Sequence, residues 1–237
     1  MADRTDAERY EAHKLAMAER SRRQSEAARE IGDLPKVAHP RRRKKCERNF
    51  RAFCESYFPE RFYIPWSRDH LKAIAKIEQA VLRGGLFALA MPRGSGKTAL
   101  CVVACIWAVL YGHRKFVLLI GAGESLALEL LEQLKKEIED NPRLNEDFPE
   151  ACYPIARLEG ILNRCPSQTY QGQRTEIVWR SDEAVMPKIP KAKSSQAVIR
   201  TRGIEGRIRG MSAMINGRPT RPDLVIVDDP QTDASAK

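Results

Sequence analysis

The sequence predicts an α/β fold, in which a mainly parallel sheet is covered by helices and preceded by a charged helical arm. Short apolar runs typical of buried strands alternate with segments of helical periodicity, and a glycine-rich turn joins one such run to an apolar helix. Alternating strands and helices favour a parallel sheet with helices on both faces. The 237 residues are enough for one sizeable domain and an appendage. We therefore expect an arm over residues 1–45 and a domain over residues 46–237.

The arm is set apart by its charge. Residues 1–45 carry 13 basic and 8 acidic side chains, and residues 1–31 have the pattern of an exposed helix with interspersed opposite charges. Leu34-Pro35 and His39-Pro40 then mark a linker, so the arm can be flexibly attached. The basic run at residues 41–45 fits two interpretations, contact with nucleic-acid phosphates or a solvated segment.

The whole chain is basic, with 41 Lys and Arg against 31 Asp and Glu and a net charge of +10. This excess favours a polyanionic partner, although a solvated basic surface would have the same composition. The longest apolar run, residues 99–110, is too short to span a bilayer and indicates a buried helix. The charged N-terminus is unlike a signal peptide. The six cysteines form no CxxC pair, which favours reduced thiols in a cytoplasmic protein without membrane contact.

The domain elements follow in order. Helical periodicity with a Gly-Gly stop predicts a helix over residues 69–82. The next expected elements are a strand at 86–91, a loop at 92–98, a helix at 99–110, a strand at 115–120 and a helix at 124–138. Four prolines make residues 141–166 loop-rich, and further strands are expected at 176–179, 197–201 and 224–227.

The loop at 92–98 has the composition of a phosphate-binding loop between a strand and a helix. Gly94 and Gly96 let backbone N–H groups turn toward phosphates, and the following helix adds its positive N-terminal end. Lys97 would neutralise the β and γ phosphates, and the Thr98 hydroxyl would bind Mg²⁺. The pattern begins with Met91, where glycine is usual. A ligand-free turn would not explain a lysine at the head of an apolar helix.

A second motif supplies acids. Residues 224–227 form a buried strand that ends in Asp228 and Asp229, and two adjacent acids there are costly without a cation or a water partner. Asp228 would bind Mg²⁺ and Asp229 would polarise the attacking water. The competing pair Asp182-Glu183 follows a strand interrupted by charge and indicates a surface turn.

A glycine- and arginine-rich segment, residues 200–210, lies between the two motifs. Its arginines suit phosphate contacts, either to DNA or to a nucleotide bound by a neighbouring subunit. A solvated loop is the alternative.

These motifs together resemble the ATPase domain of tailed-bacteriophage terminase large subunits. The resemblance rests on Pro65-Trp66-Ser67-Arg68-Asp69-His70, on Pro92-Arg93-Gly94-Ser95-Gly96-Lys97-Thr98, on the segment from Gly203 to Gly210, and on Arg221-Pro222-Asp223 leading into Asp228-Asp229-Pro230. It covers the chain from about Phe50 onward. It implies a P-loop NTPase fold and an ATP-driven motor that moves double-stranded DNA into a procapsid in the host cytoplasm. The motor would work as a homo-oligomeric ring with a portal protein and a small terminase subunit.

The resemblance also implies roles for particular residues. Arg93 would sense or act on the γ-phosphate beside the catalytic Asp229, and Thr98 and Asp228 would hold Mg²⁺. The ATP-binding set would be Trp66, His70, Pro92, Arg93, Gly94, Ser95, Gly96, Lys97 and Thr98. Trp66 or His70 would contact adenine, where the family often has a glutamine.

The sequence departs from this family after Asp229, which eight residues follow. The coupling motif and the RNase H-like nuclease domain of the family are absent from it, so we expect a domain incomplete at its C-terminal end and no nuclease activity. The family places another strand between the acidic strand and the strand before the loop, so a gap is expected at the centre of the sheet. Two alternatives stay open, a helicase-like nucleic-acid ATPase and a truncated nucleotide-binding remnant without turnover.

Overall fold

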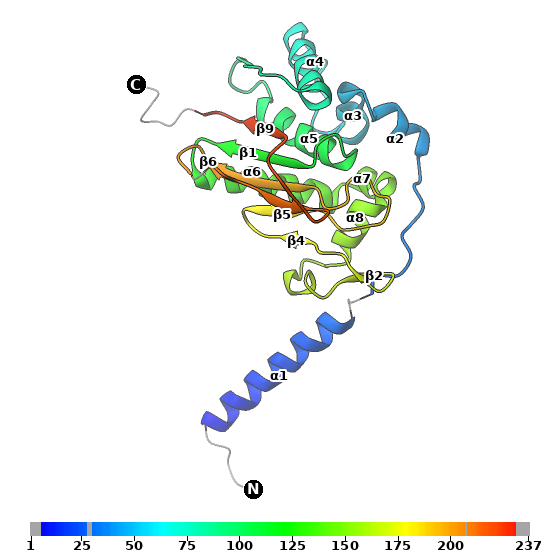
Figure 1. Ribbon diagram of the computed structural model, residues 1–237, viewed down its shortest axis with the longest axis vertical. Helices are drawn as coiled ribbons and strands as arrows, with labels where there is room; N and C mark the ends of the chain where they lie inside the picture. Colours follow the sequence, from blue (N-terminus) through cyan, green and yellow to red (C-terminus); the bar gives the residue numbers. More distant parts are fainter. Residues whose placement is uncertain (1–5, 28–29, 207, 231–237) are drawn as a thin grey trace.

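A computed structural model describes residues 6–27, 30–206 and 208–230 (Figure 1). Its helices are α1 (Asp6–Ala27), α2 (Pro40–Cys46), α3 (Phe50–Tyr57), α4 (Arg68–Arg83), α5 (Lys97–Leu110), α6 (Glu124–Asp140), α7 (Pro142–Asp147) and α8 (Pro149–Ala156), with a 3₁₀ turn η1 at Leu162–Arg164. Its strands are β1 (Phe116–Gly121), β2 (Thr169–Tyr170), β3 (Gln173–Arg174), β4 (Val178–Trp179), β5 (Glu183–Val185), β6 (Val198–Gly203), β7 (Ala213–Ile215), β8 (Arg218–Thr220) and β9 (Leu224–Val227).

Five strands form one mixed sheet in the order β4-β5-β6-β1-β9. The strand β1 pairs in parallel with β6 on one side and with β9 on the other. The strands β5 and β4 continue the sheet in antiparallel pairs, because only a short turn at residues 180–182 joins them. The α/β class is confirmed, with a parallel core inside a mixed sheet.

The two faces of this sheet are covered differently. Val117 and Leu119 of β1 pack in one core with residues of α5 and α6. Phe116 points to the opposite face, since side chains alternate along a strand, and it packs with Val198 and with Ile215 of the β7–β8 hairpin. Within the described residues, helices therefore cover one face and the hairpin packs on the other, whereas the sequence predicts helices on both.

Helix α5 is the buried helix that the apolar run predicts. Its residues from Val102 to Leu110 are fully buried. Trp107 Nε1 donates a hydrogen bond to the Cys46 carbonyl at 3.0 Å, and its ring centroid lies 5.2 Å from that of Phe50. Cys46 at the end of α2 and Phe50 at the start of α3 thus contact Trp107 and help to fix the position of α5.

The strand expected at residues 86–91 is wrong. The segment pairs with no described strand, and Leu86, Phe87 and Leu89 have exposed fractions of 101%, 37% and 40%. An apolar run becomes a strand only where a neighbour satisfies its N–H and C=O groups. Among the described strands β9 has β1 as its sole neighbour, so the sheet ends at β9, and an edge stands where a central gap was expected.

The loop-rich region expected at residues 141–166 is also wrong, because it contains α7, α8 and η1. Pro142 and Pro149 each occupy the first turn of a helix. Proline is favoured there because its missing N–H would have no partner within the helix. Two of the four prolines in this region are thus helix starts, while Pro154 lies inside α8.

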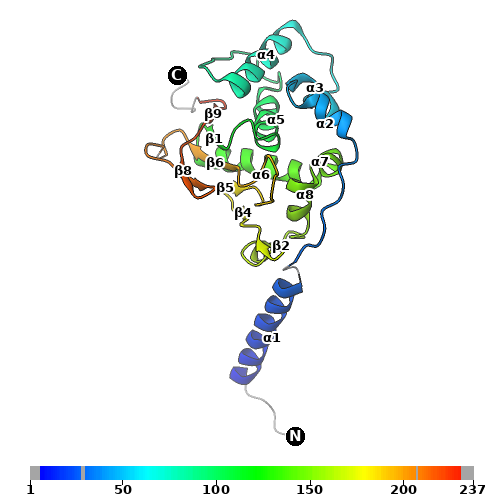
Figure 2. The ribbon, with the colours of Figure 1, turned by 45° about the vertical axis from the view of Figure 1, so that its right-hand side comes forward.

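The N-terminal arm begins with α1, which extends away from the rest of the molecule in both views (Figures 1 and 2). The helix expected over residues 1–31 is confirmed for α1, while residues 1–5 and 28–29 lie outside the described part. Beyond α1, Ile31 N donates to the Thr169 carbonyl at 3.0 Å and Thr169 Oγ1 donates to the Glu30 carboxylate at 2.9 Å. No described helix is long and apolar enough to cross a membrane.

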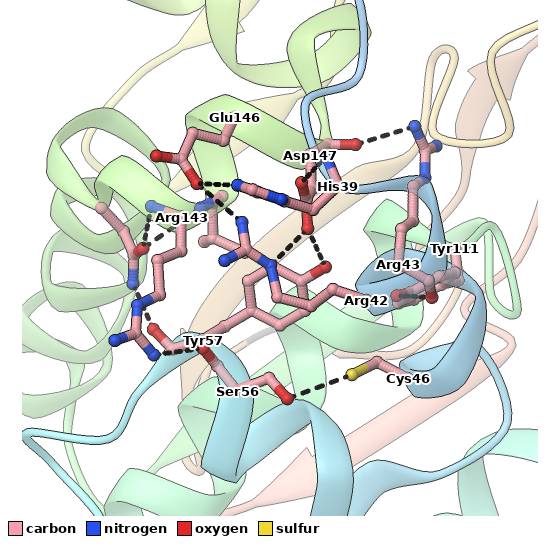
Figure 3. Close-up of polar contacts among 12 residues, drawn as sticks. His39, Arg42, Arg43, Cys46, Ser56, Tyr57, Tyr111, Arg143, Glu146 and Asp147 are labelled. Carbon is pink, nitrogen blue, oxygen red and sulfur yellow. Dashed lines mark hydrogen bonds and ion pairs between the residues drawn. The ribbon is translucent and has the colours of Figure 1, made fainter.

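The basic run at residues 41–45 lies in α2, which is docked on α7 and α8 (Figure 3). Arg42 pairs with Glu146 and Asp147, both at 2.7 Å, and Arg43 pairs with Glu150. These two arginines are therefore partly buried and engaged in ion pairs with acids of α7 and α8. Three exposed cations remain in the run, Arg41, Lys44 and Lys45. The boundary expected after residue 45 falls inside α2.

Candidate functional site

The glycine-rich loop at residues 92–98 is held by two left-handed glycines, Gly94 with φ 75° and Gly96 with φ 76°. A Cβ atom at either position would meet nothing within 4 Å, so the need for glycine comes from the backbone conformation and not from space. Gly96 is the N-cap of α5 and has no capping side chain. The first N–H groups of α5 are therefore left without side-chain partners, which is the arrangement that favours an anion.

Lys97 and Thr98 occupy the first turn of α5 and are both half-buried. The Lys97 ammonium donates to the Met91 carbonyl at 2.8 Å and so folds back over the loop. Pro92 and Arg93 are exposed at the start of the loop. This places the lysine where a phosphate could replace a carbonyl as its acceptor.

Asp228 approaches the same helix from the end of β9. Its side chain is 8% exposed, and its backbone N–H donates to the Ile120 carbonyl at 2.9 Å. Burial raises the pKa of Cys101 to about 12, with the charge of Asp228 and a hydrogen bond to it as further causes. Cys101 lies one helical turn after Lys97 and Thr98, so the fold brings the acidic strand end to the first turns of α5.

Asp229 takes a different position. It is exposed, and its backbone has a left-handed φ of 43°. This conformation is uncommon for residues other than glycine, although aspartate is among those that adopt it. The structure gives Asp229 no contact with the loop at residues 92–98.

Trp66 and His70 lie beside the loop. The His70 Nε2 atom is 2.9 Å from the Ser95 carbonyl oxygen, and Nδ1 is 2.7 Å from the Ser67 hydroxyl. The Trp66 and His70 ring centroids are 5.8 Å apart, and Trp66 Nε1 donates to the Glu55 carboxylate at 2.9 Å. Both residues expected to contact a base are thus next to the loop, and His70 is bound to its backbone.

The competing acids Asp182 and Glu183 are engaged elsewhere. Asp182 accepts from Arg202 at 2.8 Å, and Glu183 pairs with Arg200 across β5 and β6. The expected surface turn therefore includes the start of β5, and its acids neutralise arginines of the segment at residues 200–210. Arg200 and Arg202, which were expected to contact phosphates, form ion pairs within the chain. Arg207 lies outside the described residues.

Gly203 of this segment has a packing role. A Cβ atom there would come within 2.8 Å of the Glu124 backbone nitrogen at the start of α6. The glycine therefore permits the close approach of α6 to the end of β6.

The oxygen donors near the loop suit a Mg²⁺ ion that is bound together with phosphate. Among the described residues no group of three or more His, Cys, Asp or Glu side chains could hold a metal ion. Mg²⁺ commonly takes one or two protein oxygens and completes its shell with phosphate and water, so Asp228 and the Thr98 hydroxyl suit it. The Ser95 hydroxyl is buried in the loop without a hydrogen-bond partner in the described residues, as expected of a group that a ligand would satisfy.

A cavity of about 480 Å³ lies apart from this site, at the C-terminal end of α5 beside Tyr111 and His113. Besides the end of α5 it is lined by residues that follow α2, by α4 and by Lys115 and Lys193, and residues 92–98 do not line it.

Sequence reasoning missed three residues at the site, namely Cys101, Ser67 and Glu55. Ser67 had a signal, because serine is a favoured N-cap and Ser67 stands just before the expected start of the helix. Cys101 also had one, since it follows Lys97 by four residues and must lie on the same face of α5. Glu55 had none.

Searches against protein-family models, curated proteins and solved structures gave no match.

Proposed function

We propose that this chain is the ATP-hydrolysing motor domain of a viral terminase large subunit that drives double-stranded DNA packaging into procapsids. One observation carries the proposal, the convergence of the glycine-rich loop and Asp228 on the first turns of α5. The loop supplies backbone N–H groups and the Lys97 ammonium for phosphates, and Asp228 supplies the carboxylate for a cation. The resemblance of these same motifs to terminase ATPases supports the choice of reaction.

The residues have distinct roles in this proposal. Bound Mg²⁺ would neutralise charge on the β and γ phosphates of ATP. Thr98 and Asp228 hold the cation, and Lys97 exchanges the Met91 carbonyl for phosphate oxygens. Arg93 is exposed at the loop and free to reach the γ-phosphate side, and Asp229 is assigned to orienting the attacking water.

The proposed partners are double-stranded DNA, a portal protein and a small terminase subunit, with a homo-oligomeric ring acting in the host cytoplasm. The net charge of +10 supports a polyanionic partner. The described residues give this charge particular positions, since Arg41, Lys44 and Lys45 are exposed on α2. These cations are the part of the basic run that can meet DNA.

A second candidate is a nucleotide-binding protein without turnover. Two observations favour it, the unpaired segment at residues 86–91 and the exposed, left-handed Asp229. The first leaves the loop without a strand to brace it, and the second leaves the water-orienting acid away from the loop. Binding needs only the loop, Lys97 and Asp228, whereas hydrolysis also needs Asp229 in place.

The test is ATP binding and hydrolysis by the purified chain with Mg²⁺, with and without double-stranded DNA. We expect Lys97→Ala to abolish both binding and turnover, and Asp228→Asn to abolish the dependence on Mg²⁺. Asp229→Ala separates the candidates, because it stops turnover and spares binding in a working ATPase. The matched control is Asp182→Asn, which removes an acid of the competing pair and should leave binding unchanged. Unchanged nucleotide affinity in Lys97→Ala would refute both candidates.

A further inference from the structure

The contact between His70 and the glycine-rich loop defines which ring nitrogen carries the proton. The Ser95 carbonyl can only accept, so Nε2 at 2.9 Å must donate to it. Nδ1 is then the acceptor and receives the proton of the Ser67 hydroxyl at 2.7 Å. The same hydroxyl accepts from the His70 backbone N–H at 3.3 Å as the N-cap of α4. Every polar group in this chain of contacts has a compatible role.

The ring is also held from the side. Trp66 lies 5.8 Å from it between ring centroids, and the Trp66 indole is itself bound to Glu55 of α3. Phe62 also packs against Trp66, with 5.1 Å between their ring centroids. His70 is therefore fixed by its own helix and by an aromatic row before it touches the loop.

The Ser95 carbonyl belongs to a peptide bond whose orientation matters. Ser95 stands between Gly94 and Gly96, which both have left-handed φ and few barriers to rotation. The described peptides are all trans, so the Gly96 N–H points opposite to the Ser95 carbonyl. A donor that holds the carbonyl on the His70 side therefore holds this N–H on the side away from His70.

We propose that His70 is a positioning residue for phosphate binding, which sets the Ser95–Gly96 peptide so that its N–H faces the bound phosphates. This rests on the proposed function of the loop and changes the role of His70, which acts on the loop and does not read the adenine base. His70 thus promotes binding of the polyphosphate part of the nucleotide.

Inorganic tripolyphosphate with Mg²⁺ tests this directly, because it has the phosphates of ATP and no base. Two variants separate the hydrogen bond from the ring. His70→Phe keeps a ring against Trp66 and has no donor, and His70→Gln keeps an amide donor at a similar reach and has no ring. Affinities for ATP and for tripolyphosphate are measured by calorimetry, and melting temperatures show that both variants fold.

His70→Phe should lower the affinities for ATP and for tripolyphosphate by the same factor, about tenfold for the loss of one hydrogen bond. His70→Gln should keep most of the wild-type affinity for both ligands. Tripolyphosphate binding as tight in His70→Phe as in the wild type would overturn the proposal, and so would equal weakening by both variants. Lys97→Ala distinguishes the underlying function. If it leaves tripolyphosphate affinity unchanged, the loop binds no phosphates and the proposed function fails, and this role of His70 fails with it.

Discussion

Asp147 is the buried acid on which the docking of α2 depends, and its removal gives a sharp test of the fold (Figure 3). The fully buried carboxylate accepts from Arg42 Nε at 2.7 Å, from the Tyr57 hydroxyl at 2.7 Å and from the His39 backbone N–H at 3.0 Å. Burial and the hydrogen bond to Asp147 raise the pKa of Tyr57, so the phenol stays a protonated donor. Asp147→Ala leaves all three donors without this acceptor.

The expected cost follows from those contacts. The buried Tyr57 hydroxyl left without an acceptor costs about 1–3 kcal/mol, and the N–H of the exposed His39 costs less because water can reach it. Arg42 would still form its ion pair with Glu146 at 2.7 Å, so its charge would lose only one of two acidic partners. Breaking a buried ion pair on one side costs about 3–5 kcal/mol in total, and we expect Asp147→Ala to fall in that range. For a chain of this length that is a fall in Tm of roughly 10 °C.

Urea unfolding measures this loss as a lower midpoint at an unchanged slope. The matched control is Glu146→Ala, which removes the neighbouring acid of the same arginine. The Glu146 side chain is 45% exposed, and an exposed ion pair contributes at most about 1 kcal/mol. Equal losses in the two variants, or a loss below about 1 kcal/mol in Asp147→Ala, would refute the assignment of Asp147 as the anchor of α2.

Three further predictions concern single residues. Burial lowers the pKa of His113 below its usual 6.5, so the unfolded chain binds the proton more readily and stability falls as the pH drops below about 6.5. His113→Gln should flatten the urea midpoint between about pH 7.5 and 5.5, and parallel profiles would contradict this. Val225→Lys on the free edge of β9 should reduce concentration-dependent light scattering, and unchanged scattering would count against an exposed sheet edge. Gly96→Ala should lower stability by about 1–2 kcal/mol, because alanine is strained at positive φ. Gly123→Ala, an N-cap with negative φ, should cost less, and equal melting temperatures would disprove the strain.

The sequence predicted those elements whose burial is decided by their own residues. The apolar run of α5 lies where expected and is buried. The strand β9 also lies where expected, but it is only partly buried, with Val225 50% and Val227 46% exposed at the edge of the sheet. The run at residues 86–91 has a similar composition and fails, because a strand also requires a hydrogen-bonding neighbour. Whether that neighbour exists is a property of the assembled sheet.

The sequence predicted only part of the arrangement at the candidate site. The end of β9 lies near the first turns of α5, as the two motifs indicate, although no described strand leads into the loop before Lys97. The contact of His70 with Ser95 could not be predicted, because a backbone carbonyl as acceptor leaves no mark in the sequence. Asp147 could not be predicted either, since its three donors come from distant parts of the chain.

The unpaired segment before the loop raises the question of what holds the loop in place. A strand leading into residues 92–98 would fix one end, and the described structure has none there. The other end is fixed, because α5 is buried from Val102 onward and its N-cap is Gly96. His70 adds a second restraint from α4 at Ser95, and Lys97 adds a third at Met91. The loop is therefore anchored from the helical side, and its geometry can persist without the strand. In the proposed function, phosphate binding would therefore depend on the loop held by α4 and α5 and on Asp228, while turnover would also depend on Asp229 at the same edge of the sheet.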